Sequence, residues 1–357
     1  MTIEQLFAEE TQAVLADALA ELELLAGKTV LITGGTGLIG AALIRSLIAF
    51  NRTGKHDPVH ILALVRDTEK ASRMFPEGTE SGLSLLRGDV RAPLFLDETV
   101  DYVVHAAGET ASRSFVDNPV EVLETTISGV RNLLMLAREK QVRGFVFLST
   151  MEVYGAPAAG QRITETSPAE LDPMRARSSY PEGKRAAECF VAAYAAEYGV
   201  PGVSLRLTQT FGPGVGYRDG RMFQSFARAA AEGRDIVLFT EGKTMRSYLY
   251  TADAVTAVLK VLLRGAQGEA YNCANEATYC SVREMADRIA ARSEKGSAVR
   301  VELRDAEKMG FAPVLYMDLD TEKLRSLGWQ ARFGLDAMLD RLMWAAKERS
   351  AETGLNG

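Results

Sequence analysis

Short apolar runs alternate with longer segments of helical periodicity in the first part of the chain. The apolar runs occupy residues 29–33, 60–65, 83–87, 102–106, 145–149 and 202–207. The helical patterns cover residues 38–50, 119–139 and 180–197. Continuous apolar runs separated by helices are typical of parallel strands that are buried on both faces. The pattern therefore predicts an α/β domain over residues 28–205, built on a doubly wound parallel sheet.

The alternation of short apolar runs with helical patterns ends at about residue 206. Residues 211–220, FGPGVGYRDG, are rich in Gly and turn formers and predict a long loop, a kind of segment that is usually functional. Helical patterns follow at 222–232, 252–264 and 281–291. Ser281 and Glu284 have the spacing of a capping box. We expect residues 206–357 to form a smaller, mostly helical substrate-binding lobe. This lobe is partly interleaved with the parallel sheet of the first domain if the strand-like run SYLY adds a strand to that sheet.

The first 27 residues carry acidic side chains and no Lys or Arg. Five leucines fit one face of a helix: Leu6, Leu15, Leu19, Leu22 and Leu25. This segment lacks the basic start of a signal peptide. We expect residues 1–27 to be an amphipathic helix that packs on the main body or on a neighbouring subunit.

Composition narrows the class of protein. A net charge of −6 over 357 residues, with scattered basic residues, argues against a nucleic-acid partner. No apolar segment is long enough to span a membrane, so we expect a cytoplasmic protein. Cys189, Cys273 and Cys280 lack the spacing of metal ligands, so no metal site is expected.

The segment KTVLITGGTGLIG joins an apolar strand to a helix through Gly34, Gly37 and Gly40. Glycines allow a sharp turn and close approach to a pyrophosphate, and the helix N-terminus offers free N–H groups to the phosphates. The segment predicts a Rossmann-type site for a nicotinamide dinucleotide. Further cofactor contacts are expected from Thr36, Leu38, Ile39, Val90, Ala106, Ala107, Gly108 and Leu207.

The second strand ends just before Arg66 and Asp67. An acidic residue here binds the ribose hydroxyls of NAD, whereas an Arg accommodates the 2′-phosphate of NADP. Arg66 comes first and favours NADP slightly, although Arg66 stacked on the adenine is compatible with NAD. Asp89 follows the third strand, where a side chain meets the adenine edge.

Tyr180 and Lys184 lie four residues apart at the start of a helical pattern and therefore on one face. A nearby ammonium lowers the pKa of a phenol, so Tyr180 is suited to take a proton from a sugar hydroxyl. Thr150 follows an apolar strand, at the edge where open α/β sheets bind ligands. Glu152 adds a carboxylate to the same loop.

These motifs resemble the extended short-chain dehydrogenase/reductase superfamily, and within it the nucleotide-sugar epimerase/dehydratase family. The matching segments are GGTGLIG, HAAG, STMEVYG, YPEGK, RLTQTFGPG, DGR and RSYLYTADAV. In these motifs the chain is most similar to UDP-glucuronate decarboxylases and dTDP-glucose 4,6-dehydratases. The resemblance implies that Thr150, Tyr180 and Lys184 are catalytic and that Glu152 is a base at sugar C5.

The resemblance also implies a substrate side of the site. Arg221 and Arg246 match positions that hold the nucleotide diphosphate. Further substrate contacts are expected from Glu109, Arg113, Met151 and Gln209. Met151 replaces an acid that protonates the leaving hydroxyl in the glucose dehydratases, and it also replaces the Ser of the decarboxylases. Gln209 replaces a common Asn, so the sugar pocket departs from the usual pattern.

These residues predict an enzyme that oxidises C4 of a nucleotide-linked sugar and then acts at C5 or C6 by decarboxylation or dehydration. A 4-epimerase and an NADPH-dependent ketosugar reductase remain alternatives, and a nucleotide-binding protein without chemistry is a third. The helical patterns at 119–139 and 180–197 are compatible with a homodimer through a four-helix interface.

Overall fold

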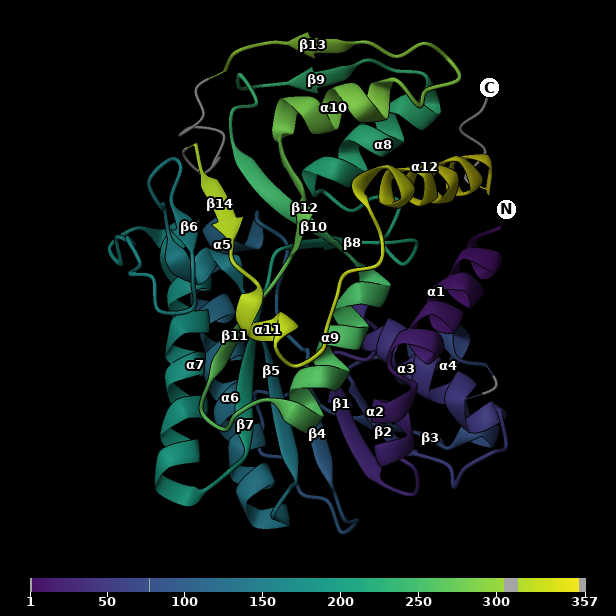
Figure 1. The fold of residues 1–357 in the computed structure, drawn as a ribbon, viewed down its shortest axis with the longest axis vertical. Coiled ribbons are helices and arrows are strands. Elements are labelled where there is room, and N and C mark those ends of the chain that lie inside the picture. Colours follow the sequence, from purple (N-terminus) through teal and green to yellow (C-terminus); the bar gives the residue numbers. More distant parts are fainter. Residues whose placement is uncertain (1, 77, 305–313, 353–357) are drawn as a thin grey trace.

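The computed structural model describes residues 2–76, 78–304 and 314–352, and its centre is a seven-stranded sheet (Figure 1). The strand order is β11-β7-β5-β4-β1-β2-β3, and all neighbours are parallel. Its strands are β1 Thr29–Thr33, β2 His60–Val65, β3 Leu83–Arg87, β4 Tyr102–His105, β5 Gly144–Thr150, β7 Gly202–Leu207 and β11 Ala270–Cys273. The order reverses between β1 and β4, which confirms a doubly wound sheet and places the expected ligand crevice there.

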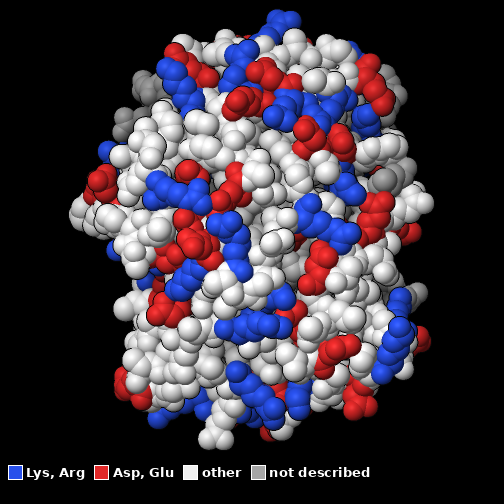
Figure 2. All heavy atoms as spheres, viewed as in Figure 1, with Lys and Arg blue, Asp and Glu red and all other residues white. Residues whose placement is uncertain are grey.

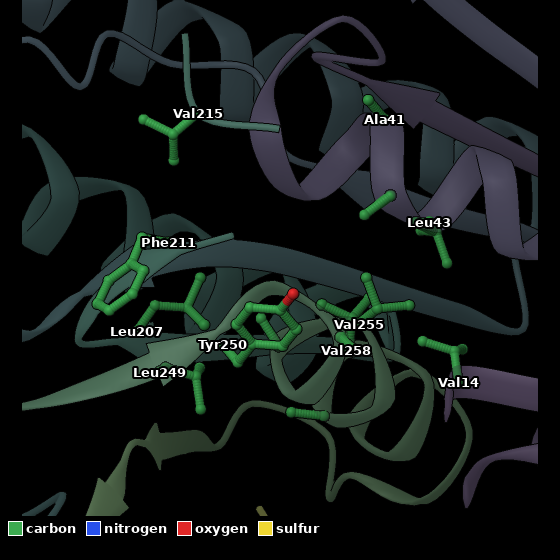
Figure 3. Packing of buried hydrophobic residues seen from close by; sticks show 14 of the residues in the cluster. Val14, Ala41, Leu43, Leu207, Phe211, Val215, Leu249, Tyr250, Val255 and Val258 are labelled. Carbon is green, nitrogen blue, oxygen red and sulfur yellow. The ribbon is translucent and has the colours of Figure 1, made fainter. Parts of the chain in front are cut away.

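Helices cover both faces of this sheet. On one face lie α1 Ile3–Asp17, α2 Leu19–Leu24, α3 Leu38–Arg52 and α9 Thr251–Arg264; on the other lie α6 Pro119–Lys140 and α7 Ser179–Tyr198. Consecutive residues of β1 alternate between the two cores, since Val30 and Ile32 pack in the first and Leu31 in the second. Figure 3 shows part of the first core, where Val14 of α1 and Val255 of α9 belong to one cluster.

The C-terminal lobe contains more strand than the sequence pattern indicates. Its helices are α8 Met222–Glu232, α10 Val282–Ala290, α11 Glu322–Arg325 and α12 Leu335–Glu352. A second sheet joins β6 Arg162–Ile163, β8 Gln209–Phe211, β10 Met245–Tyr250, β12 Asn275–Ser281 and β14 Tyr316–Leu319. A parallel pair, β9 Ile236–Leu238 and β13 Val299–Val301, lies beside α10. The SYLY run therefore belongs to the second sheet, and it is β11 that returns to the central one.

Short helices complete the loops of the dinucleotide half. They are α4 Thr68–Met74 and α5 Ser114–Asp117, with single 3-10 turns at Thr79–Ser81, Met151–Tyr154 and Ala176–Ser178. In the other half, Ser281 and Glu284 cap α10 reciprocally, as their spacing predicts.

The N-terminal segment packs on the main body as two helices instead of one. The backbone breaks at Ala18, so the second helix starts with a different phase. Leu6, Leu22 and Leu25 are buried, whereas Leu19 is exposed, contrary to the expected apolar face. Glu21 is buried in α2 and pairs with Lys260 and Arg264, which ties this segment to α9.

Charged side chains of both signs are interspersed over the face seen in Figure 2, without a continuous basic area. Within the described ranges, no helix combines the length and the apolar content that crossing a bilayer requires. Among the same residues, no three His, Cys, Asp or Glu side chains are grouped as metal ligands.

Candidate functional site

The glycine turn lies at the carboxyl end of β1 and leads directly into α3. Gly34 has φ +69°, and a Cβ there would lie 2.6 Å from the carbonyl oxygen of Ala106 on the neighbouring chain segment. A Cβ on Gly40 would lie 2.4 Å from the carbonyl oxygen of Gly34. Gly37 is the N-cap of α3, so the first N–H groups of that helix lack a side-chain cap. This geometry fits a pyrophosphate held against the turn and the helix N-terminus.

Two adjoining cavities open from this turn, with volumes of about 340 Å³ and about 550 Å³. Both are lined by Gly34, Thr36, Gly37, Lys70, Ala106 and Gly108. The smaller cavity adds Arg66, Asp89, Val90 and Ala107 to its walls. The larger adds Leu38, Ile39, Gly40, Tyr180, Lys184 and Leu207. The structure thus brings every residue predicted to contact the cofactor to one continuous site.

Three cations surround the smaller cavity: Arg66, Lys70 and Arg91. Arg91 pairs with Asp89 at 2.7 Å, and its hydrogen bonds hold the pKa of Asp89 below the ordinary value. Asp67 does not line the cavity, because its Oδ1 accepts a hydrogen bond from the backbone N–H of Lys70 at 2.8 Å and caps α4. The carboxylate that the sequence offers for the ribose hydroxyls is therefore engaged in a helix cap.

The larger cavity contains the residues predicted to be catalytic. Tyr180 and Lys184 come from the first turns of α7, and Thr150 ends β5. Burial and the charge of Glu152 raise the pKa of Tyr180 above its usual value, while a hydrogen bond with Thr150 lowers it. The ammonium of Lys184 donates to the carbonyl of Leu148 at 2.7 Å, and burial lowers the pKa of Lys184 to about 8.

An aromatic residue supports the tyrosine. The ring of Phe115 stacks on Tyr180 with 4.1 Å between centroids and 5° between planes. Phe115 lines the same cavity and is itself buried. This stacking fixes the plane of the phenol that faces the cavity.

Arg177, three residues before Tyr180, is a site residue that was not predicted from the sequence. Its Nη2 donates a hydrogen bond to Oε2 of Glu152 at 2.9 Å. The side chains of Arg177 and Glu152 are 27% and 20% exposed, so the ion pair is partly shielded from solvent. Proximity to Tyr180 in the sequence was the available signal, but nothing in the local pattern indicated the partner.

A second ion pair, which was also not predicted, connects β7 to α7, the helix that carries Tyr180 and Lys184. Glu188 follows Lys184 by one helical turn and binds Arg206 of β7 at 2.6 Å. The hydroxyl of Ser149 also donates to Glu188. Because Ser149 precedes Thr150, this network joins the end of β5 to α7.

Four of the six residues expected on the substrate side line one of the two cavities. Met151, Gln209 and Arg221 line the larger cavity, where Arg221 pairs with Asp219 at 2.8 Å. Glu109 lines the smaller cavity instead, with its carboxylate accepting from the backbone N–H groups of the two following residues.

Two other expected substrate residues lie outside the cavity walls. Arg113 is 90% exposed and pairs with Asp117 one helical turn away, so solvent and a local ion pair account for its charge. Arg246 on β10 lies in the second sheet, and its buried Nε has no partner among the described residues. The expected contacts of Arg113 and Arg246 with substrate stay predictions.

His105 ends β4 beneath the site and packs as expected for a buried histidine. Its Nδ1 lies 2.8 Å from the hydroxyl of Thr33, and its ring tilts against Phe147. Burial lowers its pKa to about 3. His105 is therefore neutral at physiological pH.

The fold and the site together define a dinucleotide-dependent enzyme of the Rossmann class with a tyrosine–lysine pair. The sequence of residues 30–274 matches the family model of the NAD dependent epimerase/dehydratase family. The chain belongs to this family. The N-terminal helices and the residues after 274 lie outside the match.

Curated relatives are similar over most of this chain. UDP-glucuronic acid decarboxylase 6 of Arabidopsis thaliana is 30% identical over 260 residues, which are 73% of each protein. UDP-glucuronic acid decarboxylase 1 of Xenopus tropicalis is 30% identical over 66% of this chain, but the match spans only 53% of that protein.

Solved structures share the fold. UDP-glucose 4-epimerase of Thermus thermophilus, in complex with NAD, is 25% identical with a TM-score of 0.73, and the match covers 90% of this chain and 99% of that one. A dTDP-glucose 4,6-dehydratase of Streptomyces venezuelae, with NAD and TYD bound, is 24% identical with a TM-score of 0.76, over 92% and 99%.

Proposed function

We propose that this protein is an NAD(P)-dependent enzyme that oxidises C4 of a nucleotide-linked hexuronate and releases its C6 carboxylate as CO₂. The observation that carries the proposal is the convergence of Thr150, Tyr180 and Lys184 on the cavity that begins at the glycine turn. The similarity to UDP-glucuronic acid decarboxylases favours UDP-glucuronate as the substrate.

Each residue of the trio has a step that suits its chemistry. Tyr180, as phenolate, takes the proton of the C4 hydroxyl, and the Thr150 hydroxyl donates a hydrogen bond to the same oxygen. The hydrogen bond with Thr150 and the charges of Arg177 and Arg221 favour the phenolate against the effect of burial, and we assign the same effect to the Lys184 ammonium, 6.0 Å from the centre of the Tyr180 ring. A dinucleotide held at the glycine turn by Gly34, Gly37 and Gly40 would supply the acceptor for the hydride of C4 and would allow its return.

Oxidation at C4 makes a C6 carboxylate part of a β-keto acid. When the C5–C6 bond breaks, its electron pair passes to C5 and the C4 carbonyl, where Thr150 and Tyr180 support the developing oxyanion. C5 then takes up a proton that comes from solvent, and we assign its relay to the carboxyl group of Glu152 in the cavity wall. Return of hydride to C4 and of the proton from Tyr180 to its oxygen gives a nucleotide-linked pentose.

Decarboxylation is favoured over dehydration by Met151. Elimination of a C6 hydroxyl needs an acid to protonate the leaving group, and the buried Met151 side chain supplies none. Loss of CO₂ needs no such acid. A methionine at this position is therefore compatible with the proposed reaction.

Product analysis of the purified protein with UDP-glucuronate, UDP-glucose and dTDP-glucose tests this function. The expected products from UDP-glucuronate are CO₂ and a UDP-pentose, without net consumption of added cofactor. Tyr180→Phe should lower kcat by about 10²–10⁴-fold while cofactor binding persists. A product inverted at C4 with C5 and C6 untouched indicates a 4-epimerase, and stoichiometric consumption of NADPH indicates a reductase.

For the cofactor we propose a preference for NADP over NAD. Arg66, Lys70 and Arg91 line the adenosine end, and Asp67 is engaged in capping α4. Arg66→Ala should weaken binding of NADP about tenfold or more and that of NAD much less, because charge-assisted contacts with phosphate are lost. Equal losses for both cofactors would contradict the preference.

We also propose a homodimer through α6 and α7. Val120 and Met135 on α6 and Tyr198 on α7 are exposed apolar side chains on adjoining helices. Light scattering on the purified protein measures the assembly. Met135→Glu should shift a dimer toward monomer, because it places a charge in the apolar interface.

A further inference from the structure

The ion pair between Arg177 and Glu152 lies at the reacting end of the larger cavity. Glu152 lines the cavity, whereas Arg177 stands behind it and donates to Oε2 at 2.9 Å. The guanidinium of Arg177 also lies over the ring of Phe115, 5.1 Å from its centroid. Since Phe115 stacks on Tyr180, the position of Arg177 is tied to the phenol as well as to the carboxylate.

The other charged residues that the structure describes in this cavity form no ion pair with Glu152. Among the described residues that line it, the charged ones are Lys70, Glu152, Lys184, Asp219 and Arg221. Asp219 and Arg221 neutralise each other at 2.8 Å. Lys70 is shared with the smaller cavity, and the ammonium of Lys184 is bonded to a backbone carbonyl. Arg177 thus supplies the positive charge that balances Glu152.

A hexuronate brings a negative charge close to Glu152. In the proposed function C4 is held at Tyr180, and the C6 carboxylate is attached to the adjacent carbon C5. Glu152 follows Thr150 by two residues and faces the same region. Two carboxylates a few ångströms apart in a partly shielded cavity repel each other unless a cation lies between or beside them.

Resting on the proposed function, we propose that Arg177 determines specificity for an acidic sugar by neutralising Glu152, so that the cavity accepts a carboxylate at C6. A neutral sugar with a hydroxymethyl group at C6 does not depend on this balance. Arg177 acts on the substrate through the charge of Glu152 and is therefore a specificity-determining residue outside the catalytic trio.

Calorimetric titration of the cofactor-loaded protein with UDP-glucuronate and with UDP-glucose, in a Tyr180→Phe background that blocks turnover, separates this role from a structural one. Arg177→Gln should weaken UDP-glucuronate binding about tenfold or more and UDP-glucose binding less than about twofold. Arg177→Lys keeps the charge and should stay within about threefold of the wild type for both ligands. Equal weakening of both ligands by Arg177→Gln would overturn the proposal.

Removing the opposing carboxylate provides the decisive control. In the double variant Arg177→Gln with Glu152→Gln, UDP-glucuronate binding should return to within about threefold of the wild type, because repulsion has gone. Failure to recover would show that Arg177 acts through structure alone. Glu152→Gln by itself, in which Arg177 is unopposed, should strengthen UDP-glucuronate relative to UDP-glucose, and this variant keeps the test available if Arg177→Gln does not fold.

The proposed reaction and the proposed specificity role of Arg177 can be overturned independently of each other. If the wild type binds UDP-glucuronate in an Arg177-dependent manner but releases no CO₂, the proposed reaction fails and the specificity role stands. If CO₂ is released but the variants discriminate neither sugar, the specificity role fails alone. Absence of UDP-glucuronate binding by the wild type would overturn both.

Discussion

The ammonium of Lys184 donates a hydrogen bond to the backbone carbonyl of Leu148 at 2.7 Å. The next residue of β5, Ser149, donates from its hydroxyl to Glu188, one helical turn beyond Lys184. Thr150 then completes the strand. These contacts from successive residues of β5 fix the position of α7 along the strand. They thereby fix where the phenol of Tyr180 and the ammonium of Lys184 lie in the cavity.

Replacing Lys184 by Met should abolish most of the activity without unfolding the protein. Burial raises the pKa of Tyr180, and the ammonium of Lys184 lies 6.0 Å from the centre of the Tyr180 ring, where a positive charge favours the phenolate. We expect kcat to fall by about 10²–10⁴-fold. Steady-state kinetics give the effect, and a thermal transition close to that of the wild type excludes misfolding. Activity within about twofold of the wild type would remove Lys184 from the proposed mechanism.

Replacing Glu188 by Gln should destabilise the fold through Arg206. The two side chains are 12% and 14% exposed, so the variant leaves a largely buried guanidinium without its carboxylate. We expect a loss of about 3 kcal/mol in the free energy of unfolding. Denaturant titration measures it.

A matched control lies on the same helix. Glu182 pairs with Arg185 at 3.4 Å, but these side chains are 33% and 45% exposed. Glu182→Gln should change stability by less than about 1 kcal/mol, because exposed pairs contribute little. Similar losses for the two variants would mean that burial of the Glu188 pair has no special effect.

Gly34→Ala should remove the dinucleotide site. The residue has φ +69°, and the new Cβ would meet the backbone of Ala106 at 2.6 Å, so the turn and β4 must separate. Gly54 has a similar φ of +64° but no atom within 4 Å of an added Cβ. Gly54→Ala therefore measures the cost of the backbone strain alone, without a steric clash. We expect this cost to be about 1 kcal/mol in the free energy of unfolding.

Fluorescence titration with NAD and NADP compares the two glycine variants. Gly34→Ala should lose binding of both cofactors, and Gly54→Ala should retain it with a slightly lower melting temperature. Binding by Gly34→Ala at wild-type affinity would show that the turn tolerates a side chain, against the close approach seen here.

The central sheet was accessible to sequence analysis because its strands are continuous apolar runs. Residues 29–33, 60–65, 83–87 and 202–207 form strands with the predicted bounds. The second sheet could not be predicted from the sequence. Its short strands, such as β6 and β14, pair across more than 150 residues and carry no local periodicity. Arg177 and Glu188 were missed for the same reason, because their roles depend on partners that only the fold brings near.

Glu10 should make stability depend on pH. This residue of α1 is 5% exposed, and its Oε1 has no hydrogen-bond partner among the described residues. Burial raises its pKa from 4.5 to about 8, despite the opposing charge of Arg45. Between these values the folded protein holds a proton that the unfolded chain releases. The stabilisation is therefore complete below pH 4.5 and is lost as the pH rises through about 8.

Glu10→Gln removes this titration and should flatten the dependence. Near pH 5 the variant and the wild type should melt at similar temperatures, whereas near pH 8.5 the variant should be the more stable, by about 2 °C or more for each kcal/mol relieved. Glu9→Gln serves as the control, because Glu9 is 43% exposed and pairs with Arg341 at the surface. Its melting temperature should follow the wild type at both pH values. A wild-type advantage over Glu10→Gln that grows from pH 5 to pH 8.5 would show that Glu10 is stabilised as a carboxylate, with Arg45 outweighing burial.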